Sequence, residues 1–159
     1  MLPDKKQVVS ILLQQVQTEL EGMESIAEAS RDEATNSETK AEGKYDTRAT
    51  EASYLARGQA WRIIELRKLA GWLDSDQATK TLEEPVVQVG ALVRIEGKRN
   101  EIVYLSPIGG GKAVINGETI RSISPSSPLG SAMIELENGD PFEVDSPRGR
   151  LDYVVLEIS

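Results

Sequence analysis

The stretch that decides the fold is VSILLQQVQTELEGMESIAEASRDEA, residues 9–34. Apolar and small side chains recur in it at alternating steps of four and three residues: Val9, Leu13, Val16, Leu20, Met23, Ala27, Ser30 and Ala34. A second row with the same spacing follows at Ala52, Ala56, Gln59, Ile63, Leu66, Ala70, Leu73 and Gln77. This heptad spacing is typical of helices that pack along a coiled-coil seam.

The two rows fit one another when the chain folds back on itself. An antiparallel pairing sets Val9 against Gln77, and every later pair, through Ala34 against Ala52, is centred on Gly43. A helical hairpin with its tip near residues 38–46 therefore satisfies all the pairs, and its arm is on the order of 50 Å long. The seam changes from Leu, Val and Ile at the base to Ala and Ser near the tip. We therefore expect the tip to be the least stable part of the hairpin.

Acidic residues are concentrated toward the predicted tip. Residues 19–51 contain ten acidic and four basic residues, whereas the rest of residues 1–84 contains six acidic and seven basic ones. Glu38, Glu42 and Asp46 lie close together in the predicted turn, and carboxylates in such a group suit a hard cation such as Mg²⁺.

Simpler roles compete with this metal site. Asp46 or Thr47 can cap the second helix, and Thr35 with Glu38 fits a capping box. Glu38 and Glu42 can also pair locally with nearby lysines. A hairpin that serves only for packing or oligomerisation is the simplest interpretation of the pattern, and the sequence does not indicate an oligomeric state.

The second half of the chain has a different composition. Six of the seven prolines lie between residues 85 and 147, and turn signals such as Asn116-Gly117 and Asn138-Gly139 are frequent. Segments 86–96, 101–106 and 151–158 are rich in Val, Ile and Tyr, as strands are, and a short helix is expected after Pro128. We therefore predict an α+β chain, with a coiled-coil helical hairpin over residues 1–84 and a small antiparallel β domain with one short helix over residues 85–159.

Composition excludes several kinds of site. The 159 residues include no Cys and no His, which removes thiolate chemistry, disulfides and the commonest metal ligand and general base. The net charge of −8 argues against binding to bare duplex DNA. No apolar run approaches the ~18 residues that a membrane span needs, and no signal peptide opens the chain, so we expect a cytoplasmic protein.

Two further features are assigned from their surroundings. The run Gly109-Gly110-Gly111-Lys112 lacks the spacing of a phosphate-binding loop and no long helix follows it, so it is predicted to be a flexible turn. Trp61 and Trp72 fall on exposed faces of the hairpin near its base. Either can pack against the β domain or against a partner.

An ordered set of motifs in the second half resembles the C-terminal signature of the bacterial Gre factors. It consists of Ser127-Pro128-Leu129-Gly130-Ser131-Ala132, Gly139-Asp140, Phe142-Glu143-Val144, Pro147, Gly149 and Tyr153. The resemblance implies an FKBP-like β domain behind an N-terminal coiled coil. It also implies an accessory transcription elongation factor rather than an enzyme, which binds RNA polymerase at the secondary channel and promotes cleavage of backtracked RNA.

The resemblance assigns roles to two segments. Tip carboxylates would help hold a catalytic Mg²⁺ shared with RNA polymerase, which makes Glu38, Glu42 and Asp46 the candidate catalytic and metal-binding residues. The family's docking loop, D-I-S-x-x-S-P, corresponds to residues 122–128, where a serine replaces the acid. The candidate partner-binding residues are Ser122, Ser124, Ser127 and Pro128.

The tip departs from the family's cleavage motif, D-x-x-E-N-A-[ED]-Y. Aligning Glu42 with the Glu of the motif puts Thr39 at the Asp position, and aligning Tyr45 puts Ala41 at the Glu position. The alternative function is therefore a polymerase-binding regulator or inhibitor without cleavage activity. A remote alternative is an FKBP-like peptide-binding module, although this half offers only three aromatic residues for a pocket.

Overall fold

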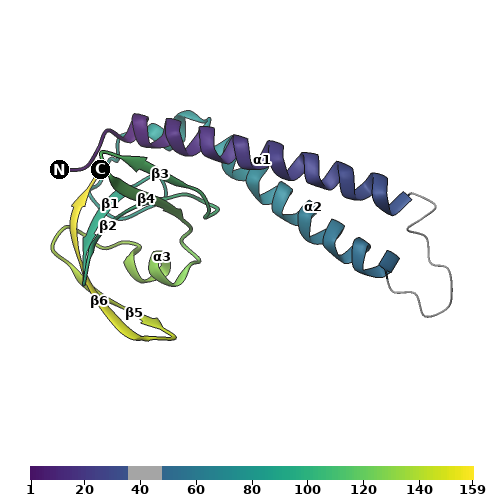
Figure 1. The fold of residues 1–159 in the computed structure, drawn as a ribbon. Helices are drawn as coiled ribbons and strands as arrows, with labels where there is room; N and C mark the ends of the chain where they lie inside the picture. The colour runs from purple at the N-terminus through teal and green to yellow at the C-terminus, as the bar shows by residue number, and fades with distance from the viewer. Residues whose placement is uncertain (36–47) are drawn as a thin grey trace.

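The computed structural model describes residues 1–35 and 48–159. Two long helices, α1 (Lys5–Thr35) and α2 (Arg48–Leu73), are followed by the 3-10 helix η1 (Asp76–Thr79). The strands are β1 (Leu92–Glu96), β2 (Asn100–Leu105), β3 (Lys112–Ile115), β4 (Glu118–Ile123), β5 (Pro141–Ser146) and β6 (Gly149–Ile158), with α3 (Pro128–Met133) between β4 and β5. The two long helices run side by side and project beyond the sheet, while the chain termini lie next to one another (Figure 1).

Helix α1 starts at Lys5 because a proline and a capping aspartate precede it. Asp4 Oδ2 accepts a hydrogen bond from the backbone N–H of Gln7 at 3.1 Å, which satisfies one of the unpaired donors of the first turn. The Asp4 carbonyl accepts the N–H of Val8 at 3.0 Å. From this point the 31 residues of α1 extend for about 46 Å.

The predicted seam is buried where the two helices meet. Six of its members are no more than 9% exposed: Val9, Val16, Ala27, Ile63, Leu66 and Leu73. The last predicted pair, Val9 with Gln77, does not extend the hairpin. Helix α2 ends at Leu73, and Gln77 lies exposed in η1.

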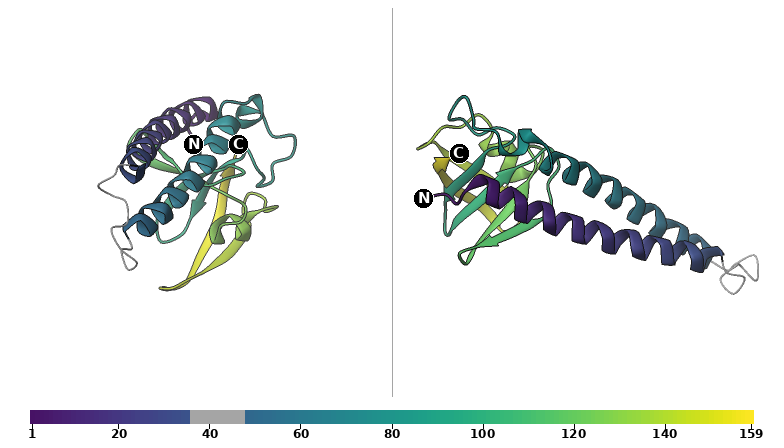
Figure 2. Two further views of the ribbon diagram at one scale, coloured as in Figure 1. Left: turned by 90° about the vertical axis from the view of Figure 1, so that its right-hand side faces the viewer. Right: turned by 90° about the horizontal axis from the view of Figure 1, so that it is seen from above.

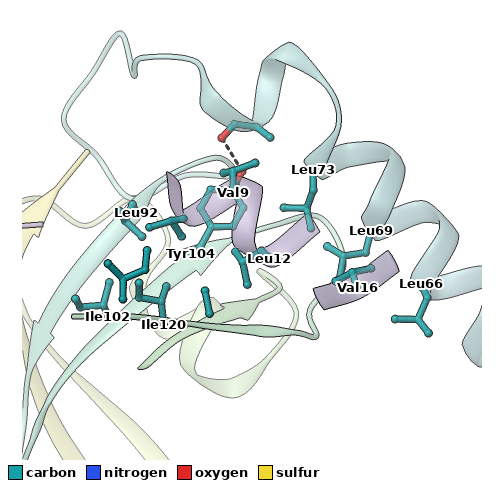
Figure 3. Close-up of a cluster of buried hydrophobic side chains, with 14 residues drawn as sticks. Val9, Leu12, Val16, Leu66, Leu69, Leu73, Leu92, Ile102, Tyr104 and Ile120 are labelled. Atoms are coloured by element: carbon teal, nitrogen blue, oxygen red, sulfur yellow. Dashed lines mark hydrogen bonds between the residues drawn. The ribbon is translucent and has the colours of Figure 1, made fainter. Parts of the chain in front are cut away.

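The base of the hairpin, residues 8–16 of α1 and 69–73 of α2, has a second buried row that the heptad pattern did not predict. Val8, Leu12 and Leu69 are at most 1% exposed and belong to one cluster with the sheet residue Ile120 (Figure 3). The row exists because the base packs on the sheet as well as on itself. Leu13, predicted to lie in the seam, is only partly buried.

The six strands form one sheet in the order β3-β4-β2-β1-β6-β5. Asn116 and Gly117, with φ angles of 52° and 80°, form the tight turn between β3 and β4, as their sequence predicted. All neighbouring strands are antiparallel except β2 and β4, which are parallel, so the sheet is mixed rather than purely antiparallel. The reason is the order of the chain: β3 runs opposite to β2, and the hairpin turn then sends β4 in the direction of β2.

Both faces of the sheet are covered, one by the base of the hairpin and the other by α3 (Figures 1 and 2). In β2, Tyr104 belongs to the cluster on the hairpin side, whereas Val103 and Leu105 belong to the cluster on the α3 side. The predicted architecture of a helical hairpin, a β domain and one short helix is confirmed. Its first strand is shorter than predicted, because β1 begins at Leu92 and Val86 forms only an isolated bridge with Glu137.

The hairpin and the sheet share a buried cluster, so the boundary between them is not a bare linker. The division of the chain at residues 84 and 85 stays a prediction.

Candidate functional site

The predicted metal-binding residues lie outside the part of the chain that the structure describes. Glu38, Glu42 and Asp46 all fall within residues 36–47. Among residues 1–35 and 48–159, no group of three or more Asp, Glu, Cys or His side chains is arranged to hold a metal ion.

The part of the hairpin beyond the base, residues 19–33 of α1 and 56–68 of α2, is here called the shaft. Ion pairs join its helices, among them Glu19 with Arg62 at 3.1 Å and Glu24 with Arg67 at 2.8 Å. Their positions in the helical repeat put them on opposite flanks of the seam. Because all four side chains are partly exposed, the pairs contribute little free energy and serve mainly to fix the register of the helices.

The serine-rich loop between β4 and α3 is ordered by its own hydroxyl groups. The Ser127 side chain caps α3 by accepting the N–H of Gly130 at 3.0 Å, and it donates to the Ser124 carbonyl at 2.7 Å. Ser124 and Ser126 share a hydrogen bond of 2.9 Å. A side chain at Gly130 would collide with the Ser124 carbonyl, so the loop requires glycine at that position.

The four predicted partner-binding residues differ in accessibility. Pro128 is exposed, while Ser124 and Ser127 are half-buried. Ser122 is only 5% exposed, and its hydroxyl lies 2.5 Å from that of the buried Ser106. The Ser122 side chain therefore belongs to the interior of the β domain, and no pattern in the sequence indicated this burial. The surface of the loop is formed by residues that follow Ser122.

The run of glycines at residues 109–111, predicted to be a flexible turn, lies in the connection between β2 and β3 and packs against the hairpin. A Cβ atom on Gly111 would lie 3.1 Å from Val16 Cγ2, and one on Gly110 would lie 3.4 Å from an Arg62 terminal nitrogen. The backbone N–H of Lys112 donates to Gln15 Oε1 at 2.6 Å. Residues 109–112, here called the glycine joint, therefore contact both helices of the hairpin and help to hold the hairpin on the sheet. They form neither a phosphate-binding loop nor a free loop.

Trp72 also connects the hairpin to the sheet, whereas the Trp61 side chain is largely exposed. Trp72 Nε1 donates a hydrogen bond of 3.0 Å to the Tyr104 hydroxyl, which donates in turn to the Ala78 carbonyl at 2.8 Å. Burial raises the pKa of Tyr104 to about 12, and the hydrogen bond from Trp72 acts in the opposite direction. Trp61 is 65% exposed on the shaft.

A pair of stacked rings lies at the other end of the sheet. Phe142 and Tyr153 have ring centroids 5.3 Å apart and line a shallow hollow with Gly97 and Glu96. Burial and the nearby Glu101 carboxylate raise the pKa of Tyr153. Phe142 is only 8% exposed, so this hollow presents little aromatic surface to a peptide.

The comparisons with known proteins identify the β domain. The family model "Transcription elongation factor, GreA/GreB, C-term" matches residues 82–159, which include the serine loop, α3 and the stacked rings. Transcription elongation factor GreA of Acetivibrio thermocellus is 26% identical over 152 residues, covering 92% of this chain and 91% of that protein. The β domain of this chain therefore matches the C-terminal domain of the GreA/GreB factors.

Individual GreA/GreB relatives match to different extents. Transcription elongation factor GreA of Nitratidesulfovibrio vulgaris is 35% identical over 82 residues, 49% of this chain, and the match spans about half of that relative, 47% of its length. The crystal structure of GreA factor homolog 1 (Gfh1) of Thermus thermophilus covers 94% of this chain and 95% of that one at 20% identity, with a TM-score of 0.37.

Among the described residues, no helix combines the length and the apolar character that crossing a bilayer requires.

Proposed function

We propose that this chain binds RNA polymerase at its secondary channel and promotes cleavage of backtracked RNA through carboxylates at the tip of the hairpin. The chain would act as an accessory factor, with the bond-breaking step carried out in the active centre of the polymerase. Three carboxylates, Glu38, Glu42 and Asp46, provide the hard oxygen donors that Mg²⁺ prefers. When bound, the ion would activate the attacking water and neutralise charge at the phosphate.

The observation that carries this proposal is the acidic α1 helix on a hairpin attached to a GreA/GreB domain. Between Glu19 and Glu33 this helix has six acidic residues and one basic residue, and the three candidate carboxylates follow it in the chain. The hairpin projects from the sheet, so its distal end is the part able to enter a narrow channel (Figure 1). Packing with the β domain does not require this charge, because the base carries the apolar contacts.

The test is a cleavage assay on stalled, backtracked elongation complexes over a range of Mg²⁺ concentrations. We expect the chain to accelerate RNA shortening. With the triple variant Glu38→Ala, Glu42→Ala, Asp46→Ala, the cleavage rate should be at least tenfold lower than with the wild type. A charge-matched control changes Asp74, Glu84 and Glu96 to Ala, exposed acids away from the predicted tip and from the acidic part of α1, and should retain the rate. Equal rates for the wild type, the triple variant and a reaction without factor would refute the cleavage activity.

The serine loop supplies a separate test of docking. Pro128→Lys places a long charged side chain on the exposed start of α3, and Pro147→Lys makes the same change on the exposed turn between β5 and β6. If the serine loop is the docking surface, the Pro128 variant should bind core polymerase at least fivefold more weakly and the Pro147 variant should bind normally. Equal affinities would remove the docking role from this loop.

A second function is favoured by the tip sequence itself. No gap-free alignment places acids at both acidic positions of the family motif, which supports a polymerase-binding regulator or inhibitor without cleavage activity. The same assay separates the two functions. A regulator would bind the polymerase and change the elongation rate without shortening the backtracked RNA.

A further inference from the structure

Helix α2 has an apolar exposed face that no contact within the described residues explains. Trp61 is 65% exposed and Ile64 is 43% exposed, and a spacing of three residues places them on the same side of the helix. Neither hydrogen bonds nor ring contacts involve the Trp61 side chain in the described part of the chain. A tryptophan left so exposed in a chain with 4% aromatic residues is a signal for an interaction surface.

Beside this face lies a groove between the two helices of the shaft. The groove has a volume of about 580 Å³, and its floor is made of small and apolar side chains, Ala27, Ala56, Ala60, Ile63 and Ile64. Its rims are charged, with Glu24 and Glu28 on α1 and Arg67 on α2. Small residues on the floor leave room for the apolar side chains of a third helix to enter.

The two helices of the shaft carry opposite charge. Residues 19–33 of α1 include six acidic residues and one basic residue, whereas residues 56–68 of α2 include four basic residues and one acidic residue. Lys68 lies one turn beyond Ile64 and two turns beyond Trp61, on the same side of α2. The exposed apolar face is therefore bordered by positive charge.

We propose that this surface, defined by Trp61, Ile64 and Lys68 with the adjacent groove, binds an acidic amphipathic helix of a protein partner. Apolar side chains of that helix would lie in the groove and against the indole, as in other helix-in-groove complexes. Its carboxylates would face Lys68, because Arg67 is already paired with Glu24. A nucleic-acid strand fits less well, because it carries phosphates along its whole length and some would lie next to Glu24 and Glu28 of α1. An amphipathic helix can instead keep its carboxylates on one face, away from α1.

The identity of the partner rests on the proposed function: the helix belongs to RNA polymerase, and the shaft makes a second contact besides the serine loop. The first measurement is the affinity of purified core polymerase for the wild type and for Trp61→Ala. We expect a loss of at least tenfold, and a loss of about fivefold for Lys68→Glu that shrinks as salt is raised. Circular dichroism melts of each variant check that the hairpin is intact.

Ile26→Ala is the matched control, since Ile26 is 53% exposed on α1 and lies outside the groove. It should bind the polymerase within twofold of the wild type. If Trp61→Ala also binds normally, the shaft surface is refuted while the proposed function survives. If the wild type does not bind the polymerase at all, both proposals fail.

A photocrosslinker resolves the chemistry of the contact. Benzoylphenylalanine in place of Trp61 should crosslink to one acidic helical segment of a polymerase subunit, and the same group in place of Ile26 should not. A crosslink to RNA or DNA in elongation complexes would overturn the choice of a protein helix. A crosslink to a polymerase segment that lacks acidic residues would overturn the charge complementarity.

Discussion

The base and the shaft of the hairpin are made of the same two helices but are held together in different ways. In the base, Val8, Leu12 and Leu69 are at most 1% exposed because each helix contacts the sheet as well as its neighbour. In the shaft, Ala27 and Ile63 lie between the two helices outside the cluster shared with the sheet, and exposed ion pairs link the helices on both flanks. The comparison teaches that the sheet stabilises one end of the hairpin, while the other end is free to carry exposed apolar and charged groups.

The largest expected effect comes from opening a cavity in the base. Leu12→Ala should lower the free energy of unfolding by about 3 kcal/mol, because a fully buried leucine loses its contacts with both the partner helix and the sheet. Ile63→Ala in the shaft should cost about half as much, since its site can admit water. Urea unfolding followed by circular dichroism measures both, and equal losses would show that the sheet does not distinguish the two regions.

The buried phenol of Tyr104, in the strand β2 under the base, makes the free energy of unfolding depend on pH in the alkaline range. Tyr104 has a folded-state pKa of about 12, above the value of about 10 expected for an unfolded chain. The stabilising effect of the neutral Tyr104 phenol is complete below pH 10. It is lost as the pH rises toward 12, because in this range mainly the unfolded state releases the proton. The free energy of unfolding falls by roughly 2 kcal/mol near pH 11.5. Unfolding at pH 9 to 11.5 should show this loss in the wild type and a smaller one in Tyr104→Phe.

The contribution of the glycine joint to stability can be divided into a backbone effect and a packing effect. Gly111 and Gly117 have φ angles of 81° and 80°, but a Cβ atom at Gly111 would lie 3.1 Å from Val16, whereas at Gly117 nothing lies within 4 Å. Gly117→Ala should cost about 1 kcal/mol for the left-handed conformation, and Gly111→Ala should cost about 1 kcal/mol more because the helix must shift. An equal decrease in the free energy of unfolding for both variants would show that Gly111 is not tightly packed against α1.

The smallest effect is a gain in the shaft. Gln59 Oε1 is buried without a hydrogen-bond partner among the described residues, at a seam position otherwise occupied by apolar groups. Gln59→Leu should raise the free energy of unfolding by up to about 1 kcal/mol, because an unsatisfied polar group is replaced by an apolar one of similar size. The matched change Gln17→Leu, at an exposed position of α1, should have almost no effect in the same thermal melt.

The sequence predicted the seam because heptad spacing depends only on how two helices face each other. Val9, Val16 and Leu73 are buried as that spacing requires. The second row, with Val8 and Leu12, was missed because it depends on where a sheet formed by residues about 100 positions later comes to lie. No local period of the helix contains that information.

The same reason limits the prediction of the β domain and of the site. Tight turns such as Asn116-Gly117 are local and were predictable, while the parallel pairing of β2 with β4 follows from the path of the chain between strands. The buried hydroxyl pair of Ser106 and Ser122 joins neighbouring strands and has no sequence signature. The predicted roles of Glu38, Glu42 and Asp46 stay predictions, because these residues lie outside the described ranges.

The contact between α1 and β3 has a consequence for how the protein is made. Val8 and Leu12 leave the ribosome long before Ala113 and Ile115, the β3 residues in their cluster. At about 5–20 residues per second, the apolar face of the first helix waits roughly 5–20 s for its cover. The two helices can pair before the sheet is made, so the nascent chain exposes the apolar face of the base. A chaperone or the emerging strands must cover that face before synthesis ends.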